Sequence, residues 1–136
     1  MHTQMIFVNL AVSDVETSKK FFTDLGYTIN KQFCSEDTAS VVISDTIIAM
    51  LLEKSRYQEF TKKQIADSTT TSEVMLCLSA ESREKVDELV DRALTVGGSP
   101  AGEKQDMGFM YGRSFDDPDG HTWEVVWMDP AALEES

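Results

Sequence analysis

Glu124 is the side chain in this sequence whose surroundings most call for a chemical explanation. It lies in Thr122–Met128 (TWEVVWM), where strand-forming residues alternate and place Trp123, Val125 and Trp127 on one face. An ionised carboxylate inside such an apolar strand is costly unless it is paired, hydrogen-bonded or protonated. We therefore expect Glu124 to hold a ligand, to act as a general acid or base, or to pair with a cation.

The residues before this strand predict how it is positioned. Asp116–Gly120 (DDPDG) predicts a tight turn, because proline presets φ, aspartate bonds to nearby backbone and glycine supplies a positive φ. A β-forming run at Phe109–Phe115 precedes the turn and predicts a terminal hairpin. Arg113 is the nearest cation on that preceding strand, so a purely structural Glu124–Arg113 ion pair is the alternative to a functional carboxylate.

Length and charge limit the classes of protein that this sequence can represent. With 136 residues it suits one domain, or two small modules that share a core. The net charge of −12 disfavours nucleic acid and anionic membrane surfaces as partners. We see no secretory signal pattern and no apolar run of membrane-spanning length, and the two cysteines are far apart. We therefore expect a cytoplasmic protein with two free, buried thiols.

The first half of the chain predicts the element order β-α-β-β-β. Ser13 and Glu16 have the spacing of a capping box, and Gly26 is a natural helix end. The expected strands, which surround this helix in sequence, are Met5–Val12, Tyr27–Phe33, Thr38–Ile43 and Thr46–Leu52. Glu53–Thr71 then predicts a short helix and a polar connector, which is also long enough to serve as a lid over a pocket.

The second half repeats this order. We expect a strand at Glu73–Leu78, a helix capped by Ser79 and ended by Gly97-Gly98, a weaker strand between Ser99 and Gln105, and the terminal hairpin. The prediction is one domain of residues 1–136, with module one at about 1–55, a connector at 56–72 and module two at about 73–136.

Aligning the two halves selects the candidate site residues. VNLAVS at residues 8–13 lies over VMLCLS at residues 74–79, so Phe7 corresponds to Glu73, and overlaying the last strands sets Ala49 opposite Glu124. Two modules related by a pseudo-two-fold axis would direct these four positions into one cavity. Further candidates for its wall, taken from strand parity and from the hairpin, are Asn9, Met75, Tyr111 and Arg113.

Two stretches carry a resemblance to a known family. IFVNLAVSDVETSKKFFTDLGY (Ile6–Tyr27) and SFDDPDGHTWEVVWMDP (Ser114–Pro130), within paired β-α-β-β-β modules, resemble the vicinal oxygen chelate superfamily. That superfamily includes glyoxalase I, extradiol dioxygenases, fosfomycin-resistance enzymes and bleomycin-resistance proteins, and the likeness is strongest to bacterial glyoxalase-like proteins of unassigned substrate. The resemblance implies an α+β fold in which the modules form a half-open mixed barrel around a cavity, a small organic ligand and a homodimer.

The resemblance also implies where a metal would bind in such a protein. Its first and last strands usually supply His and Glu ligands, which here correspond to Phe7, Ala49, Glu73 and Glu124. Phenylalanine and alanine cannot ligate a metal, so the implied site is degenerate and the sequence indicates no definite cofactor. A divalent metal held by Glu73, Glu124, solvent and substrate stays an alternative.

Three functions follow from these features. The preferred one is a glyoxalase- or bleomycin-resistance-like protein or enzyme that binds a small molecule through Glu124 and Glu73. The second is a metal-dependent lyase, isomerase or dioxygenase of the same superfamily, such as a lactoylglutathione lyase-like enzyme. The third is sequestration of a cationic, drug-like ligand without turnover, which the net charge of −12 favours.

Overall fold

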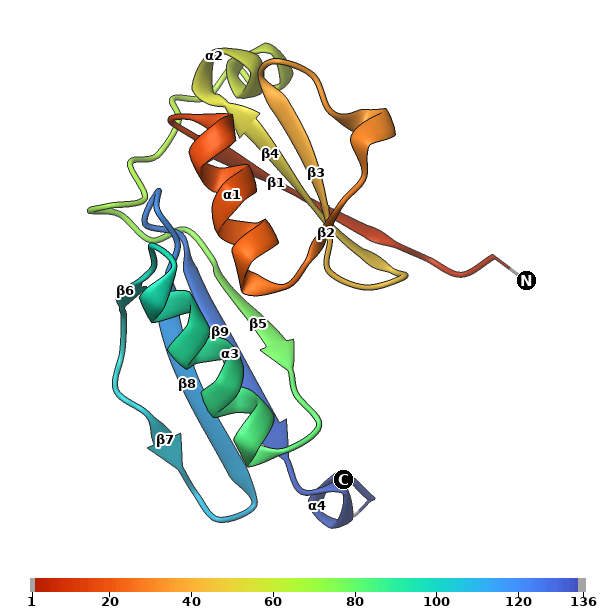
Figure 1. The fold of residues 1–136 in the computed structure, drawn as a ribbon, viewed down its shortest axis with the longest axis vertical. Coiled ribbons are helices and arrows are strands. Elements are labelled where there is room, and N and C mark those ends of the chain that lie inside the picture. Colours follow the sequence, from red (N-terminus) through yellow and green to blue (C-terminus); the bar gives the residue numbers. More distant parts are fainter. Residues whose placement is uncertain (1, 135–136) are drawn as a thin grey trace. The chain divides into compact units, whose positions relative to one another are not determined.

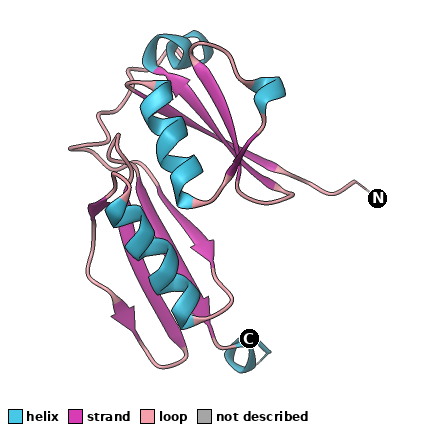
Figure 2. Cartoon of the chain, in the orientation of Figure 1, coloured by secondary structure: helices cyan, strands magenta, loops and turns pink. Residues whose placement is uncertain are grey.

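The computed structural model describes residues 2–134, and the chain divides into two compact units between Asp67 and Ser68. We call residues up to Asp67 the first unit and those from Ser68 the second unit. Each unit is a mixed sheet with one long helix packed against one of its faces (Figures 1 and 2). The sheet face opposite that helix is called the open face below.

The first unit has one strand before its long helix, three strands after that helix, and three short helical turns. Its elements are β1 (Ile6–Val12), α1 (Val15–Leu25), β2 (Thr28–Ile29), η1 (Lys31–Phe33), β3 (Thr38–Val42), β4 (Ile47–Glu53), α2 (Lys54–Tyr57) and η2 (Gln58–Phe60). The strand order is β1-β4-β3-β2, with β1 parallel to β4 and the other pairs antiparallel. This is the predicted β-α-β-β-β order.

Capping residues set both ends of helix α1. Its N-cap is Asp14, whose Oδ1 accepts a hydrogen bond from the Glu16 backbone N–H at 3.2 Å, so the prediction that Ser13 is the cap was wrong by one residue. Gly26 ends the helix at φ 115°, a left-handed conformation that glycine adopts without strain. The buried rings of Phe21 and Phe22 lie edge-to-face with centroids 5.0 Å apart.

The second unit repeats the arrangement with a longer helix. Its elements are β5 (Met75–Ser79), α3 (Arg83–Thr95), β6 (Ser99–Pro100), β7 (Gln105–Asp106), β8 (Met110–Asp116), β9 (Thr122–Met128) and α4 (Pro130–Glu134). The strand order is β5-β9-β8-β6, with β7 also paired to β8 and β5 parallel to β9. Ser82, rather than the predicted Ser79, caps α3 by accepting from the Lys85 N–H at 3.1 Å.

The α+β class and the two β-α-β-β-β modules are therefore confirmed, and neither sheet closes into a barrel by itself. Two elements differ from expectation. The strand expected at Tyr27–Phe33 ends at Ile29, after which Asn30 caps a turn of 3₁₀ helix by accepting from the Gln32 N–H. The weaker strand expected between Ser99 and Gln105 is two short strands, one at each end of that stretch. Within residues 2–134, no helix is both long and apolar enough to span a membrane.

Candidate functional site

Glu124 lies in β9 on the open face of the second sheet. The neighbouring positions on either side are Cys77 in β5 and Ser114 in β8. Residues 123 and 125 of the same strand are buried beneath α3, as alternation along a strand requires. The prediction that Glu124 shares a strand with a buried apolar stripe is thus confirmed, and its side chain is directed away from that stripe.

The Glu124 carboxylate is half-buried and has no hydrogen-bond or ion-pair partner among residues 2–134. Its charge acts on the neighbouring thiol: partial burial raises the pKa of Cys77, and the negative charge of Glu124 raises it further. The same face presents the large apolar side chains of Met75, which is 62% exposed, and Met128. An unpaired carboxylate thus lies among thiol and thioether groups on a face that no helix of its unit covers.

Glu73 precedes this sheet instead of lying within it. The strand expected to begin at Glu73 begins at Met75, and Glu73 is an exposed residue in a bend. No hydrogen bond joins its carboxylate to another described residue. A joint role for Glu73 and Glu124 therefore stays a prediction.

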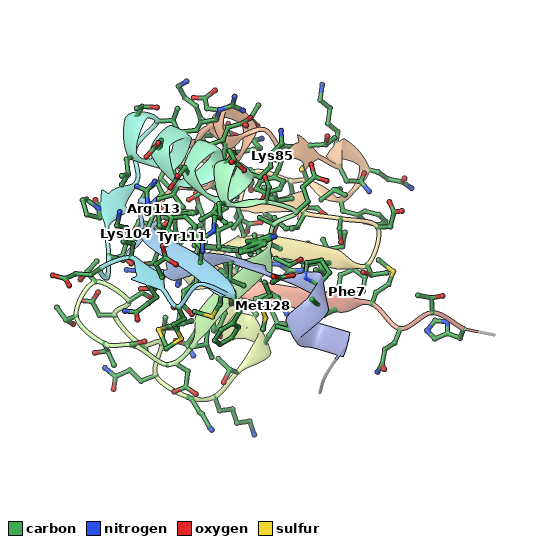
Figure 3. All side chains as sticks on the ribbon, turned by 90° about the horizontal axis from the view of Figure 1, so that it is seen from below. Phe7, Lys85, Lys104, Tyr111, Arg113 and Met128 are labelled. Atoms are coloured by element: carbon green, nitrogen blue, oxygen red, sulfur yellow. The ribbon has the colours of Figure 1, made fainter. Side chains whose placement is uncertain are left out.

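Arg113 does not pair with Glu124, so the ion-pair alternative was wrong. In the antiparallel register Arg113 lies opposite Val125, one position beyond Glu124, and its side chain therefore points to the helix-covered face. There its Nη1 donates to Oδ1 of Asp87 and Oδ1 of Asp91, each at 2.9 Å. Figure 3 shows Arg113 between α3 and the sheet.

Tyr111 joins the same network rather than the face of Glu124. Its hydroxyl donates to Oδ1 of Asp87 at 2.6 Å. This hydrogen bond is the main factor that raises the pKa of Tyr111 and lowers that of Asp87. Tyr111 and Arg113 were both expected near Glu124. They instead connect β8 to α3, because their side chains lie on the opposite face of the sheet from Glu124.

A polar groove accompanies this network at the edge of the sheet. It has a volume of about 470 Å³. Its lining residues come from α3, from β8 and from the segment between β6 and β8, where Lys104 lies close to Arg113 in Figure 3. Because Arg113 and both carboxylates are already paired with each other, we interpret this groove as part of the helix attachment.

The candidates in the first unit lie on two different faces of its sheet. Phe7 is 57% exposed and, like Asn9, belongs to the open face, since the alternate residues Leu10 and Val12 are buried under α1. Ala49 is paired with Val8 in the parallel register and is only 1% exposed. The expectation that Ala49 lines a cavity with Phe7 was therefore wrong.

The residue across from Phe7 on β4 is Ile48, which the sequence reasoning missed. Because Ala11 pairs with Leu52 and its counterpart Cys77 pairs with Glu124, the residue that corresponds to Glu124 is Leu52, and the overlay of the last strands was three residues out. A shift by an odd number of residues moves every side chain of a strand to the other face.

A pocket of about 300 Å³ lies on the open face of the first sheet. It is lined by residues from β1, β4 and the segment after β4, namely Asn9, Leu52, Tyr57, Phe60 and Thr61. Tyr57 and Phe60 belong to the stretch that was expected to be a short helix and a polar connector. The helical turns α2 and η2 make that stretch one wall of a pocket.

The turn before Glu124 forms as predicted and is held by Asp117. Its Oδ1 accepts from the backbone N–H groups of Asp119 and His121, each at 3.0 Å, and its Oδ2 accepts from Nε1 of Trp123 at 3.1 Å. Burial raises the pKa of Asp117, while His121 and these hydrogen bonds act in the opposite direction. Asp117 therefore has a structural role, which explains how a carboxylate is buried next to Pro118.

Metal-binding side chains do not gather in the described part of the chain. Among residues 2–134 no three His, Cys, Asp or Glu side chains lie together as a metal site requires. The donor set thus does not fit the ion that the superfamily resemblance implies, and we derive no reaction step through it. Cys34 and Cys77 are free thiols, but Cys77 is exposed, so the expectation that both are buried was wrong.

Comparisons with known proteins identify the class of protein to which this fold belongs. The family model of the Glyoxalase/Bleomycin resistance protein/Dioxygenase superfamily matches residues 4–125. The chain therefore belongs to this superfamily. No curated protein matches it.

Solved structures share the fold over nearly the whole chain. A hypothetical protein from S. aureus is 28% identical, with 93% of this chain and 95% of that chain covered at a TM-score of 0.77. A glyoxalase/bleomycin resistance protein/dioxygenase family enzyme from Burkholderia phytofirmans is 14% identical, with 93% and 99% covered at 0.78. The fosfomycin resistance protein FosX from Listeria monocytogenes is 18% identical, with 93% and 92% covered at 0.66. The last two show the fold alone.

Proposed function

We propose that this protein binds a small, amine-bearing organic molecule on the open face of the second sheet, with Glu124 as the polar centre. The single observation that carries the proposal is the Glu124 carboxylate, half-buried and without a hydrogen-bond or ion-pair partner among residues 2–134. Keeping such a group unpaired is unfavourable unless a ligand satisfies it. An ammonium group does so by charge-assisted hydrogen bonds, which are stronger than those between neutral groups.

The surroundings of Glu124 favour a ligand with an apolar body. Met75 and Met128 expose flexible thioether side chains on this face, and methionine adapts to ligands of irregular shape. Glu73, which lies two residues before the edge strand β5, is proposed as a second carboxylate for a ligand that extends past β5. The chain's net charge of −12 further favours a cationic ligand.

We further propose that the protein is a cytoplasmic homodimer. Two cysteines with no disulfide between them suit a reducing compartment. The edge strand β1 exposes Ile6 and Phe7, and exposed apolar side chains on an unpaired edge favour association with a second chain. Sedimentation velocity over a concentration series distinguishes a stable dimer from a monomer.

Calorimetric titration with a matched pair of probes tests the ligand proposal. We expect 2-naphthylmethylamine to bind more tightly than 2-naphthylmethanol, because only the amine can pair with Glu124. The Glu124→Gln variant should weaken amine binding by about tenfold or more, the usual effect of losing one hydrogen bond to a charged group. The same variant should leave alcohol binding nearly unchanged.

Two comparisons make this test decisive. Glu73→Gln should weaken amine binding less than Glu124→Gln, since Glu73 is exposed in a bend outside the strand. If Glu124→Gln binds the amine as tightly as the wild type, the proposal is wrong. Equal affinity of the amine and the alcohol for the wild-type protein would contradict it too.

A further inference from the structure

The pocket of the first unit has features of a binding site in its own right. We propose that it binds a planar aromatic ring that carries an anionic group, such as an aromatic carboxylate. All of its lining residues belong to the first unit, so the proposal does not depend on Glu124.

The walls of this pocket suit a flat ring. Two of its five lining residues, Tyr57 and Phe60, are aromatic, and Leu52 forms an apolar base. Phe60 is 66% exposed, although a ring of its size is normally covered. Aromatic pairs prefer offset or edge-to-face contacts, which a flat ligand can make with these side chains. A volume of about 300 Å³ is at the lower end for ligand pockets, which fits one or two fused rings.

The backbone that presents Phe60 is fixed by specific hydrogen bonds. Nε2 of Gln58 donates to the carbonyl oxygens of Thr61 at 3.0 Å and Lys63 at 2.8 Å. The Thr61 hydroxyl accepts from the Lys63 N–H at 3.1 Å. Because these bonds close the turn that follows Phe60, its ring is displayed on an ordered segment, which lowers the entropic cost of binding.

Asn9 supplies the polar group that orients a ligand. Its exposed amide has no hydrogen-bond partner among the residues that the structure describes. An amide offers both an acceptor oxygen and two N–H donors. A polar substituent on a bound ring, whether a hydroxyl or a carbonyl oxygen, can therefore be recognised at this position.

The five lining residues are uncharged, but the segment that supplies three of them is basic, and its positive charge favours an anion. Residues 54–63 contain four of the chain's 12 cations, Lys54, Arg56, Lys62 and Lys63, against one anion, Glu59. Glu59 is already paired with Arg56 at 3.0 Å, and the three lysines have no ion pair within the described chain. This segment thus has a net charge of +3, from four positive and one negative side chain, in a protein of net charge −12.

Neighbouring groups do not cancel this preference. The Glu53 carboxylate accepts from the Val15 N–H at 3.0 Å, and the Asp37 carboxylate accepts from the hydroxyls of Ser35 and Thr38. These donors are neutral, so both carboxylates keep their charge, but with Glu53 included residues 53–63 still contain four positive and two negative side chains. The Arg56 guanidinium carbon lies 4.8 Å from the centre of the Phe60 ring. One face of that ring therefore makes a cation–π contact with Arg56.

Calorimetric titration with 2-naphthoate, 2-naphthamide and 2-naphthylmethylamine tests this proposal. We expect the order of affinity for the Glu124→Gln variant to be acid, then amide, then amine, since that variant lacks the proposed amine site. The Phe60→Ala variant should weaken 2-naphthoate binding by about threefold to tenfold, the usual worth of one aromatic contact. Phe33→Ala, which truncates a 58% exposed phenylalanine of the same unit outside the pocket lining, is the matched control and should leave the affinity unchanged.

Charge is tested separately from the ring contact. The Lys62→Gln/Lys63→Gln double variant should weaken 2-naphthoate binding and leave 2-naphthamide binding nearly unchanged. If the amine binds the Glu124→Gln protein at least as tightly as the acid, the pocket is not an anion site and the proposal is wrong. Equal effects of Phe60→Ala and Phe33→Ala, or no measurable binding of 2-naphthoate, would also overturn it. Loss of 2-naphthoate binding on Glu124→Gln would assign that probe to the second unit instead.

Discussion

Arg113 and Glu124 lie on adjacent strands of one sheet, yet their side chains point to opposite faces. The register sets Arg113 opposite Val125, so the guanidinium lies beneath α3 with Asp87 and Asp91, while Glu124 lies on the open face. Arg113 is therefore paired with α3, whereas Glu124 has no hydrogen-bond or ion-pair partner among residues 2–134. This division of roles can be measured directly.

We predict that Arg113→Met lowers the free energy of unfolding of the second unit by about 1–2 kcal/mol. The Arg113 side chain is only 21% exposed and donates two charged hydrogen bonds to α3, which its loss would remove. Both tryptophans of the chain, Trp123 and Trp127, belong to this unit. Urea denaturation followed by tryptophan fluorescence therefore reports on the second unit.

Glu124→Gln is the matched comparison, and it should change the same free energy by less than about 0.5 kcal/mol, because Glu124 has no partner to lose within residues 2–134. Lys85→Gln, which breaks an exposed pair with Glu88 on α3, should have an equally small effect. A Glu124→Gln variant less stable than Arg113→Met would show that Glu124 is the structural residue of the two.

We predict that Gly120→Ala destabilises the second unit by about 2–4 kcal/mol. Gly120 has φ 88°, which is strained for any residue with a Cβ. An added Cβ would also lie 2.8 Å from the carbonyl oxygen of Ser68, in the segment that crosses the turn. The backbone of one of these two segments would have to move.

Gly108→Ala distinguishes backbone strain from the close contact with Ser68. Gly108 has φ 81° but no heavy atom within 4 Å of an added Cβ. Its substitution should therefore cost about 1 kcal/mol from backbone strain alone. Equal losses for the two variants would mean that the contact with Ser68 is not close in solution. The same denaturation measurement applies to both.

The sequence was sufficient to predict the order of the long helices and strands. Period-2 alternation located β9 as Thr122–Met128 without error, and Gly26 and the turn at Asp116–Gly120 have the predicted positive φ at their glycines. These features are local, because each depends on residues close together in the chain. The repeat of β-α-β-β-β then followed from the order of these elements.

Which side chains share a face depends on strand register and on residues distant in the sequence, and the predicted placements of Arg113, Tyr111 and Ala49 were wrong. Whether Arg113 can reach Glu124 depends on which residue of β9 lies opposite it, and its true partners are on α3, 22 and 26 residues away. Ala49 was misplaced for the same reason, since an error of three residues in register, like any odd shift, reverses the face. Local pattern does not determine register.

We predict that Asp106 contributes stability that is lost in strong acid. The Arg83 guanidinium, which donates to both carboxylate oxygens at 3.0 Å, lowers the pKa of Asp106 from 3.8 to about 2, and the Gly108 N–H assists. Because the folded-state pKa is below the unfolded value, the contribution is present above about pH 4 and disappears as the pH falls to about 2. The guanidinium carbon of Arg83 also lies 5.2 Å from the centre of the Trp127 ring.

Asp106→Asn isolates this contribution. The variant should unfold at a lower urea concentration than the wild type at about pH 7, and the two midpoints should converge as the pH falls through about 2. Differences due to other carboxylates cancel, since they are present in both proteins. A difference in midpoint that stays constant from pH 7 to acid would show that Asp106 acts through packing and not through its charge.

We predict that Glu124→Gln makes the Cys77 thiol more reactive. Partial burial and then the Glu124 charge raise the pKa of Cys77, so less thiolate is present at a given pH. Removing the charge should lower this pKa and speed alkylation of Cys77 by iodoacetamide at about pH 8, as measured by mass spectrometry of the modified peptides.

Cys34 is an internal control for this experiment, because it belongs to the first unit and its Sγ donates to the Asn30 carbonyl oxygen at 3.3 Å. Its alkylation rate should be the same in the wild type and in Glu124→Gln. Faster alkylation of both cysteines would indicate a loosened fold. An unchanged or slower rate at Cys77 alone would mean that Glu124 and Cys77 are not neighbours on the open face in solution, and the proposed ligand site would lose its polar centre.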